Sequence, residues 1–418
     1  MSLIKNSFYN IVGFAIPTMI AIPSFGILAR WLSVEEFGIF TLTFALVGYA
    51  SIFDAGLSRA VTREISIFRF DKNEKSKIVG TASIVILIMG IIASCILFYS
   101  SASLTDFLRV SDGYKDVVTE SFKVLSFILP CYLLDLIWMG YLQGIEKFST
   151  VNFQKVISNS SIMLLPVIFC FFDKSILYAT YGLIAGRVIS VSLSFILCKD
   201  IIYKGSFRFN HLVFQRLVKF GSWITVSNII SPLMVYFDKF LVSNLLGSQK
   251  VAYYTAPAEG VNRLINVPIA LTMALFPKIS NAKTIEEQRS LEKISYAIIS
   301  LICLPIAIIG IIFSESIMTI WMGVEYGVKS SIILKILFVG YYFNSLAQIP
   351  YTILQSKGFS KYTAIIHAIE IFPYLILIFF STQEFGLVGA AVIWSLRVFI
   401  DFLLLLGFNY KVRKKVLI

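Results

Sequence analysis

The sequence has little charge for its length, and this scarcity excludes an ordinary water-soluble protein. Only 14% of the 418 residues are charged, whereas 57% are hydrophobic. Soluble domains usually carry about 25% charged residues. The composition is therefore typical of an integral membrane protein, whose outer surface faces lipid.

The chain also lacks the short motifs of common enzyme active sites. It contains no Gly-x-x-x-x-Gly-Lys-Ser/Thr loop, no His-Glu-x-x-His, no Gly-x-Ser-x-Gly and no Cys-x-x-Cys. Its five cysteines lie within apolar stretches at no metal-like spacing, so we interpret them as small hydrophobic residues. The sequence thus predicts no enzyme, no resident cofactor and no metal site, and any transport would use an ion gradient or the substrate's own gradient.

Long apolar stretches fill most of the chain. A membrane-spanning helix needs about 20 apolar residues at a rise of about 1.5 Å each. Twelve stretches meet this requirement. They lie near residues 8–30, 38–57, 78–99, 118–140, 151–171, 175–198, 219–246, 251–276, 294–314, 331–354, 362–380 and 386–408.

The twelve stretches divide into two halves with faint internal similarity. Three short sequences recur in order at a nearly constant offset: Leu142-Gln143 and Leu354-Gln355, Phe148-Ser149 and Phe359-Ser360, Arg187-Val188 and Arg397-Val398. Because six spans are an even number, both halves begin on the same side of the membrane. We expect an all-α membrane protein of twelve transmembrane helices in two six-helix lobes, residues 1–200 and 219–418, joined by a cytoplasmic linker at 201–218.

The net charge of +12 is concentrated on one side of this arrangement. Alternate connecting segments hold 24 Lys and Arg residues on one side and six on the other. By the positive-inside rule, the basic side and both termini lie in the cytoplasm of a bacterial inner membrane. We interpret the basic loops as orientation signals and contacts with membrane lipids, and we expect no nucleic-acid partner.

Charged residues inside the apolar stretches are the candidates for function, because burying a charge in a bilayer costs roughly 2.5–3.5 kcal/mol or more. Arg187 has no carboxylate three or four residues away, so its partner must be another helix or a ligand. The repeat places Arg397 opposite it, and two guanidinium groups are suited to bind phosphate oxygens. The predicted substrate-binding cations are Arg187, Arg397, Lys239 and Arg263.

Spacing also predicts internal ion pairs and sites for a coupling ion. Glu259 and Arg263 are four residues apart, as are Arg397 and Asp401, so each pair could neutralise itself along one helix. Buried carboxylates are the candidates for H⁺ or Na⁺ coupling. These are Asp54, Asp238, Glu259 and Glu370.

Six short motifs are spread along the chain: ARWLSVEEFGIF at 29–40, DAGLSRA at 54–60, LQGIEKF at 142–148, FDKFLV at 237–242, FPKIS at 276–280 and GLVGAA at 386–391. In the same order, they resemble motifs of the Wzx-type O-antigen flippases, the polysaccharide-transporter branch of the MOP superfamily. The resemblance extends over the whole chain, although each motif alone is loose.

The resemblance implies a MATE-like, V-shaped bundle that moves an undecaprenyl-diphosphate-linked oligosaccharide, an O-antigen or similar repeat unit, from the cytoplasmic to the periplasmic leaflet. It also implies a polysaccharide polymerase and a chain-length regulator as partners in lipopolysaccharide biosynthesis. An ion-coupled small-molecule exporter of the same superfamily is the main alternative. A membrane glycosyltransferase or polymerase would be expected to have a large outer loop, and the outer loops here are short.

Overall fold

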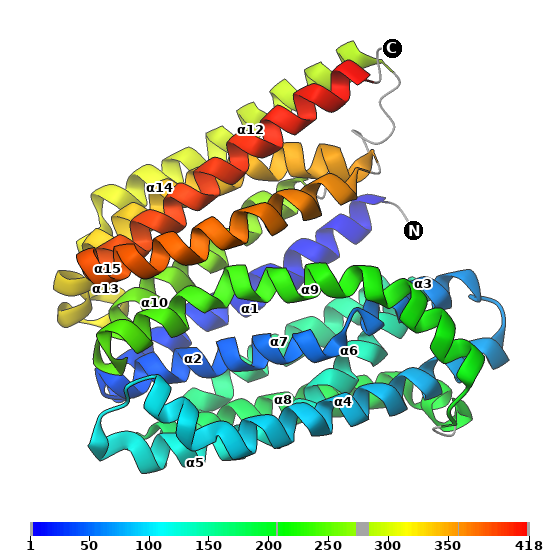
Figure 1. Ribbon diagram of the computed structural model, residues 1–418, viewed down its shortest axis with the longest axis horizontal. Coiled ribbons are helices and arrows are strands. Elements are labelled where there is room, and N and C mark those ends of the chain that lie inside the picture. The colour runs from blue at the N-terminus through cyan, green and yellow to red at the C-terminus, as the bar shows by residue number, and fades with distance from the viewer. Residues whose placement is uncertain (1–2, 206–207, 273–283, 358, 416–418) are drawn as a thin grey trace. The chain divides into compact units, whose positions relative to one another are not determined.

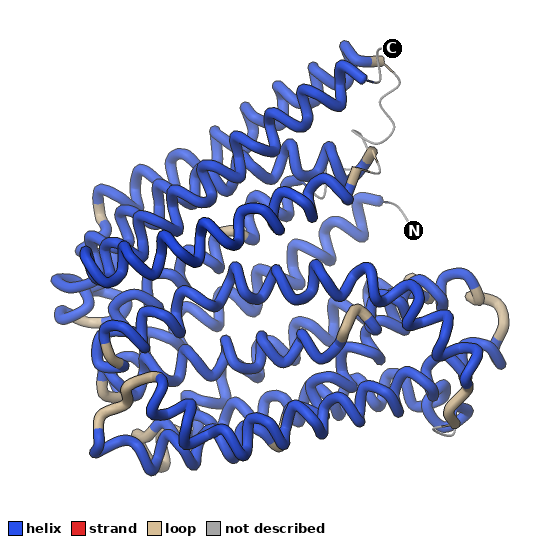
Figure 2. Tube along the Cα trace, in the orientation of Figure 1, coloured by secondary structure: helices blue, strands red, loops and turns tan. Residues whose placement is uncertain are grey.

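The computed structural model describes residues 3–205, 208–272, 284–357 and 359–415, so the motif at 276–280 lies outside the described residues. The described chain is helical, and no strand occurs in it (Figure 2). The elements are α1 Leu3–Trp31, α2 Val34–Ala50, η1 Ser51–Asp54, α3 Leu57–Ile67, α4 Lys72–Phe107, η2 Asp112–Tyr114, α5 Lys115–Ser126, α6 Leu129–Gly144, α7 Phe148–Phe169, α8 Ile176–Gly205, α9 His211–Leu246, α10 Ser248–Leu264, α12 Ile285–Ile312, α13 Ser314–Met322, α14 Val324–Ser356 and α15 Ser360–Lys415 (Figure 1).

The chain forms two compact units. The first consists of Met1–Phe240 with Gly247–Gln249, and the second consists of Leu241–Leu246 with Lys250–Ile418. These units are defined by contacts between backbone positions. The lobe boundaries at 200 and 219 stay a prediction.

In the first unit, α4, α6, α7 and α8 run side by side (Figure 1). Two Gly-x-x-x-Gly sequences allow close helix packing, because a Cβ atom would not fit at these positions. A Cβ on Gly186 of α8 would lie 2.7 Å from the Ile162 Cα on α7. A Cβ on Gly144 of α6 would lie 2.8 Å from the Thr62 carbonyl oxygen on α3. The glycines therefore bring α8 against α7 and α6 against α3.

In the second unit, α14 packs against α12, α13 and α15. Helix α15 is two helices joined at Gly386, whose φ of 59° and ψ of −140° interrupt the helical geometry. Glycine adopts positive φ without the steric cost that other residues pay. The break falls at the first residue of the second of the two spans predicted at 362–380 and 386–408.

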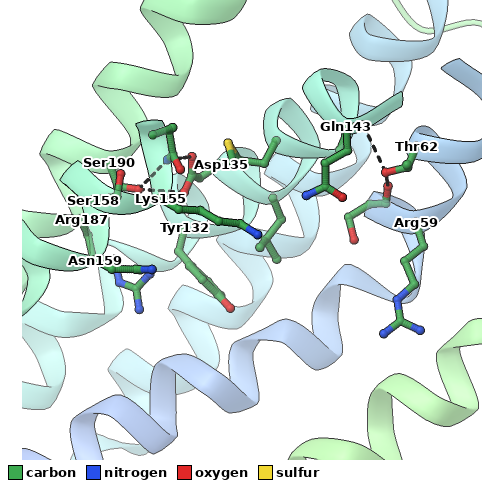
Figure 3. Close-up of a pocket in the computed structure, with 15 residues that line it drawn as sticks. Arg59, Thr62, Tyr132, Asp135, Gln143, Lys155, Ser158, Asn159, Arg187 and Ser190 are labelled. Carbon is green, nitrogen blue, oxygen red and sulfur yellow. Dashed lines mark hydrogen bonds between the residues drawn. The ribbon is translucent and has the colours of Figure 1, made fainter. Parts of the chain in front are cut away.

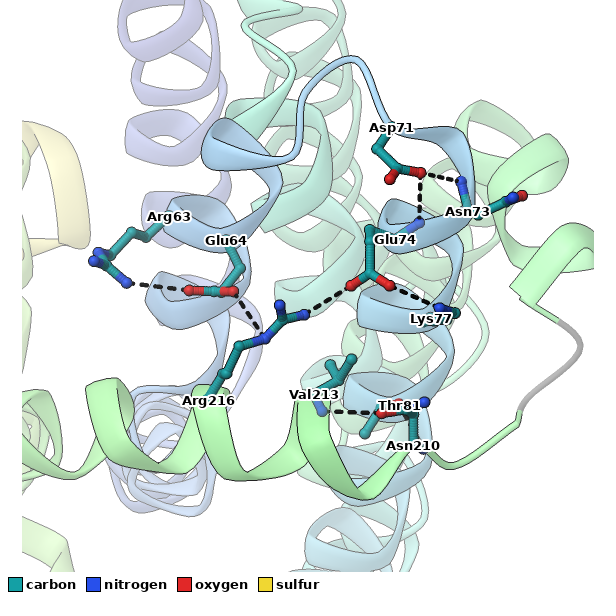
Figure 4. A network of polar contacts seen from close by, with 10 residues as sticks. All are labelled: Arg63, Glu64, Asp71, Asn73, Glu74, Lys77, Thr81, Asn210, Val213 and Arg216. Atoms are coloured by element: carbon teal, nitrogen blue, oxygen red, sulfur yellow. Dashed lines mark hydrogen bonds and ion pairs between the residues drawn. The ribbon is translucent and has the colours of Figure 1, made fainter.

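Segments predicted on the basic side meet at one end of the first unit. Arg216 on α9 forms ion pairs with Glu64 on α3 at 3.4 Å and Glu74 on α4 at 2.9 Å (Figure 4). Arg69 forms an ion pair of 2.6 Å with Glu146, which follows α6. The predicted loops at 58–77 and 199–218 thus lie together with the chain after α6.

Segments predicted on the opposite side also meet. Glu36 completes a capping box with Ser33 at the start of α2 and accepts a hydrogen bond of 3.2 Å from the Ile176 N–H at the start of α8. Glu35 accepts hydrogen bonds from the Ser111 N–H at 2.8 Å and from the Ser248 hydroxyl. Both ends of the first unit therefore gather the segments that the alternating topology predicts for them.

Seven helical segments of the described chain are long and apolar enough to cross a membrane. The chain is therefore a multi-pass membrane protein, while the count of twelve stays a prediction. Two segments between predicted spans are partly helical: α3 begins one residue before 58–77 and covers its first part, and α13 does the same for 315–330. Helix α3 buries Leu57, Val61 and Ile65 on one side, so an amphipathic helix is stable there although its opposite side is polar.

Candidate functional site

The first unit contains a polar cavity of about 360 Å³. Four helices, α3, α6, α7 and α8, line it (Figure 3). Its lining residues are Ser58, Arg59, Thr62, Tyr132, Asp135, Leu136, Met139, Gly140, Gln143, Gln154, Lys155, Ser158, Asn159, Arg187 and Ser190. A cavity of this size and polarity within a membrane bundle is a candidate binding site.

Helical periodicity explains why these side chains meet. On α6, the lining positions 132, 135, 136, 139, 140 and 143 recur every three or four residues, which places them on one face. The same spacing holds for 154, 155, 158 and 159 on α7 and for 187 and 190 on α8. The close packing of α7 and α8 at Gly182 and Gly186 brings the last two faces together.

Three cations line the cavity. Lys155 is half-buried on α7, and Figure 3 shows its side chain between Arg187 and Gln143. Arg59, on α3, is exposed. Cations that share a cavity repel one another, and a bound anion would relieve that repulsion.

Arg187 has no carboxylate as an ion-pair partner among the described residues. Its guanidinium lies over the Tyr132 ring, with the Cζ atom 4.8 Å from the ring centroid. Its Nε atom is buried without a hydrogen-bond partner. The prediction that another helix supplies its partner is thus met by an aromatic ring on α6, and its N–H donors remain available for a ligand.

Asp135 is the carboxylate in the cavity lining, and it accepts hydrogen bonds from neutral side chains instead of pairing with Arg187. It accepts hydrogen bonds from Ser190 Oγ at 2.9 Å, from Gln154 Nε2 at 3.2 Å and from Ser194 Oγ. Asp135, Gln154, Ser190 and Ser194 are all buried. This network stabilises a buried carboxylate without an arginine.

The second unit holds its own cluster of charged residues. Arg397 lies over the Tyr374 ring at 5.2 Å, and its Nε atom has no hydrogen-bond partner. Both carboxylate oxygens of Glu370 are buried and likewise without hydrogen-bond partners. His367 Nε2 lies 3.5 Å from Asp401 Oδ1, and the His367 ring is stacked on Tyr351.

The predicted ion pairs have different outcomes. The Glu259–Arg263 pair is present, at 3.9 Å. The prediction of an Arg397–Asp401 pair is wrong, because Asp401 contacts His367 and Arg397 stacks on Tyr374. Both residues lie after the break at Gly386, whereas their partners His367 and Tyr374 lie before it.

The remaining predicted residues lie away from the cavity lining. Lys239 is almost completely buried, 5.7 Å from the Tyr236 ring centroid, and Asp238 accepts a hydrogen bond from the Lys239 N–H. Asp54 accepts hydrogen bonds from the Ser58 N–H at 2.9 Å and the Ser58 hydroxyl at 2.8 Å, which satisfies one backbone N–H in the first turn of α3. Their proposed roles in binding and coupling stay predictions.

Sequence reasoning missed most of the cavity. The charge pattern places Lys155 among the orientation signals of the basic side, and Tyr132, Asn159 and Gln143 carry no charge that would single them out. The signal was present as a polar stripe at 154, 155, 158 and 159 within the apolar stretch 151–171. Polar residues at helical spacing inside a span indicate a face turned toward protein or water rather than lipid.

Comparison with known proteins supports the resemblance. The model of the polysaccharide biosynthesis protein family matches residues 3–283. This chain belongs to that family. It is also 45% identical over 97% of both chains to a Shigella flexneri protein named as a candidate O-antigen transporter. The resemblance to Wzx-type O-antigen flippases is therefore confirmed, and the chain is a transporter rather than an enzyme.

Solved structures confirm the fold. An inward-facing MATE-family multidrug resistance transporter of the MOP superfamily has a TM-score of 0.78 at 16% identity, with 97% of this chain and 99% of that one covered. The lipid II flippase MurJ in an inward closed conformation has a TM-score of 0.79 at 16% identity, with 97% and 87% covered. The chain thus has the all-α, MATE-like membrane fold.

Proposed function

We propose that this protein is a flippase that moves an undecaprenyl-diphosphate-linked oligosaccharide from the cytoplasmic to the periplasmic leaflet by alternating access. The observation that carries the proposal is the cavity of the first unit. It combines Arg187, Lys155 and Arg59 with the amides Asn159 and Gln143 inside a membrane bundle. Cations bind a diphosphate, and amides exchange hydrogen bonds with sugar hydroxyls.

The chemistry of the substrate explains why such a cavity is needed. A diphosphate and several sugars cannot cross about 30 Å of hydrocarbon without a polar path. The polyprenyl tail is apolar and can stay in lipid while the head group moves through the protein. In this proposal the basic end of the first unit faces the cytoplasm, where the head group enters.

The alternative of an exporter for cationic small molecules is less consistent with the lining. Such a substrate requires exposed carboxylates, whereas the lining has three cations and one carboxylate, Asp135, which is already bound by neutral donors. An oligosaccharide repeat unit as cargo also agrees with the name carried by the Shigella flexneri relative. The polymerase and chain-length regulator remain partners that we expect from the family resemblance alone.

We also propose that Glu370 carries the coupling proton. A buried carboxyl group without hydrogen-bond donors is costly when charged, so it can take up a proton readily. Arg397 and Asp401 lie within electrostatic range of it, and Asp401 in turn contacts His367. Proton uptake and release at this cluster would change the charge balance of the second unit, which is the kind of change that can drive a conformational cycle.

The proposed function is tested with purified protein in proteoliposomes. Each preparation receives a lipid-diphosphate-linked oligosaccharide, a polyprenyl monophosphate without sugars, or a cationic dye. We expect transfer of the first, measured as access of an external sugar-modifying enzyme, and no accumulation of the dye. Dye transport without oligosaccharide transfer would establish the exporter alternative instead.

A further inference from the structure

Asp135 and Arg187 line the same cavity in the first unit, yet they do not pair. Each acts electrostatically on the other, but no ion pair within 4.0 Å joins them. In a medium of low dielectric, opposite charges that share one cavity attract each other strongly. The observed separation therefore needs a cause, and the contacts of Asp135 supply one.

Three neutral side chains donate hydrogen bonds to the Asp135 carboxylate. Ser190 and Ser194 follow Arg187 on α8 by three and seven residues, so both lie on its side of that helix. Their hydroxyl groups donate to Oδ2 and Oδ1, respectively, and the Gln154 amide donates to Oδ1 from α7. Gln154 Nε2 also lies 2.9 Å from Ser194 Oγ and 3.2 Å from Ser190 Oγ, so its two N–H groups are shared among the carboxylate and both hydroxyl oxygens.

We infer that Ser190, Ser194 and Gln154 are positioning residues that hold the Asp135 carboxylate away from Arg187, so that the guanidinium remains available to an anionic group. The inference rests on the proposed function, because it assigns the diphosphate as that group. An arginine that is already in a bidentate pair with a carboxylate cannot offer the same donors to phosphate. Neutral donors satisfy Asp135 without consuming the cation.

Without the hydroxyl groups of Ser190 and Ser194, Asp135 should compete with phosphate for the N–H donors of Arg187. With both serines replaced by alanine, the carboxylate keeps only Gln154 and lacks two of its three donors. A buried carboxylate with unmet hydrogen-bonding capacity takes the nearest available donors, and Arg187 has them. The expected result is weaker anion binding even though no cation has been removed.

The test measures the affinity of the full-length protein, purified in detergent, for inorganic pyrophosphate. We expect the Ser190→Ala/Ser194→Ala variant to bind about tenfold more weakly than the wild type, as loss of one charge-assisted contact predicts. Addition of Asp135→Asn to this variant should restore the affinity, because the competing charge is gone. A general packing defect would not be repaired by this third substitution.

A matched control and a second variant complete the test. Ser121 is a buried serine on α5, outside the cavity lining, whose hydroxyl donates to the Val117 carbonyl oxygen at 2.8 Å, so Ser121→Ala should leave pyrophosphate binding unchanged. Asp135→Asn alone should bind pyrophosphate at least as tightly as the wild type. Weaker binding by this single variant, or failure of the rescue, would overturn the positioning role.

The outcomes also separate this inference from the proposed function. If the wild type binds pyrophosphate and the serine variant binds it equally well, the positioning role is wrong and the cavity remains the substrate site. If the wild type binds no pyrophosphate and transfers no lipid-linked oligosaccharide, both proposals fail.

Discussion

The side chains that line the cavity differ in how far the sequence alone identifies them as functional. Arg187 could be predicted because it is a charge inside an apolar stretch with no carboxylate one turn away. Asp135 could be recognised as an intramembrane charge, but its three donors could not, because they come from two other helices. Which helices are neighbours is decided by packing, and a single sequence does not contain that information.

A substitution of Lys155 tests directly whether the cavity binds an anion. Lys155→Met keeps the length of the side chain and removes one of the three lining cations. We expect pyrophosphate affinity to fall about tenfold, because an interaction between a charged donor and phosphate is lost. The matched control is Lys123→Met, which removes an exposed cation of the same unit outside the lining, and equal losses in both variants would contradict the assignment.

Glu370 gives a second prediction, about coupling. The Glu370→Gln substitution keeps the shape of the side chain but prevents it from binding and releasing a proton. We expect transfer in proteoliposomes to lose its dependence on an imposed pH gradient, while slow transfer down the substrate gradient persists. The unpaired state of both carboxylate oxygens is the reason for choosing this residue.

The coupling measurement needs a comparison variant that changes a neighbouring carboxylate and keeps Glu370. Asp401→Asn removes the partner of His367 and leaves Glu370 intact. An unchanged pH-gradient dependence in Glu370→Gln, together with its loss in Asp401→Asn, would move the coupling site to Asp401.

Helix packing determines whether the lining residues meet at all. The glycines at 182 and 186 could be read from the sequence as a Gly-x-x-x-Gly pattern, but the pattern does not identify the partner helix. The structure identifies it as α7, at Ile162 and Pro166. For α3, the sequence did not indicate the helix itself. Its polar residues suggested a loop, whereas burial of its apolar face stabilises a helix.

Gly186→Val should disturb this packing. Even its Cβ would lie 2.7 Å from the Ile162 Cα, so α8 must move away from α7. We expect a loss of stability of about 1–3 kcal/mol, measured as a lower thermal unfolding temperature in detergent, together with weaker pyrophosphate binding. Gly407→Val is the control, because a Cβ at this helical glycine meets nothing within 4 Å, and equal destabilisation of the two variants would contradict the explanation.

The polar network at the basic end makes a further prediction for α9. Arg216 connects α9 to Glu64 on α3 and Glu74 on α4, and Glu64 is buried (Figure 4). Arg216→Ala should lower stability by about 1–2 kcal/mol, a value reduced because the arginine is partly exposed. Replacing Glu64 by Gln in the same variant should recover part of the loss, and a further loss on that replacement would show that Glu64 does not depend on Arg216.

At the scale of the molecule, alternation of charge along the chain was the strongest sequence signal. It predicted which connecting segments share an end. In the first unit, 58–77 contacts 199–218 through Glu74 and Arg216 at one end, and Glu35 contacts Ser111 and Ser248 at the other. The predicted opposition of Arg187 and Arg397 stays a prediction, because these residues belong to different units. The alternating access that we propose would depend on how the two units move, which is a property of the whole transporter.

The most direct measurement is transfer of a lipid-diphosphate-linked oligosaccharide in proteoliposomes by the wild type, Arg187→Ala and Lys123→Ala, with folding of each checked by thermal unfolding. The account predicts that Arg187→Ala reduces transfer about tenfold or more, because the uncommitted guanidinium binds the diphosphate, whereas Lys123→Ala transfers like the wild type. Wild-type rates in a folded Arg187→Ala variant would contradict the claim that this cavity binds the substrate.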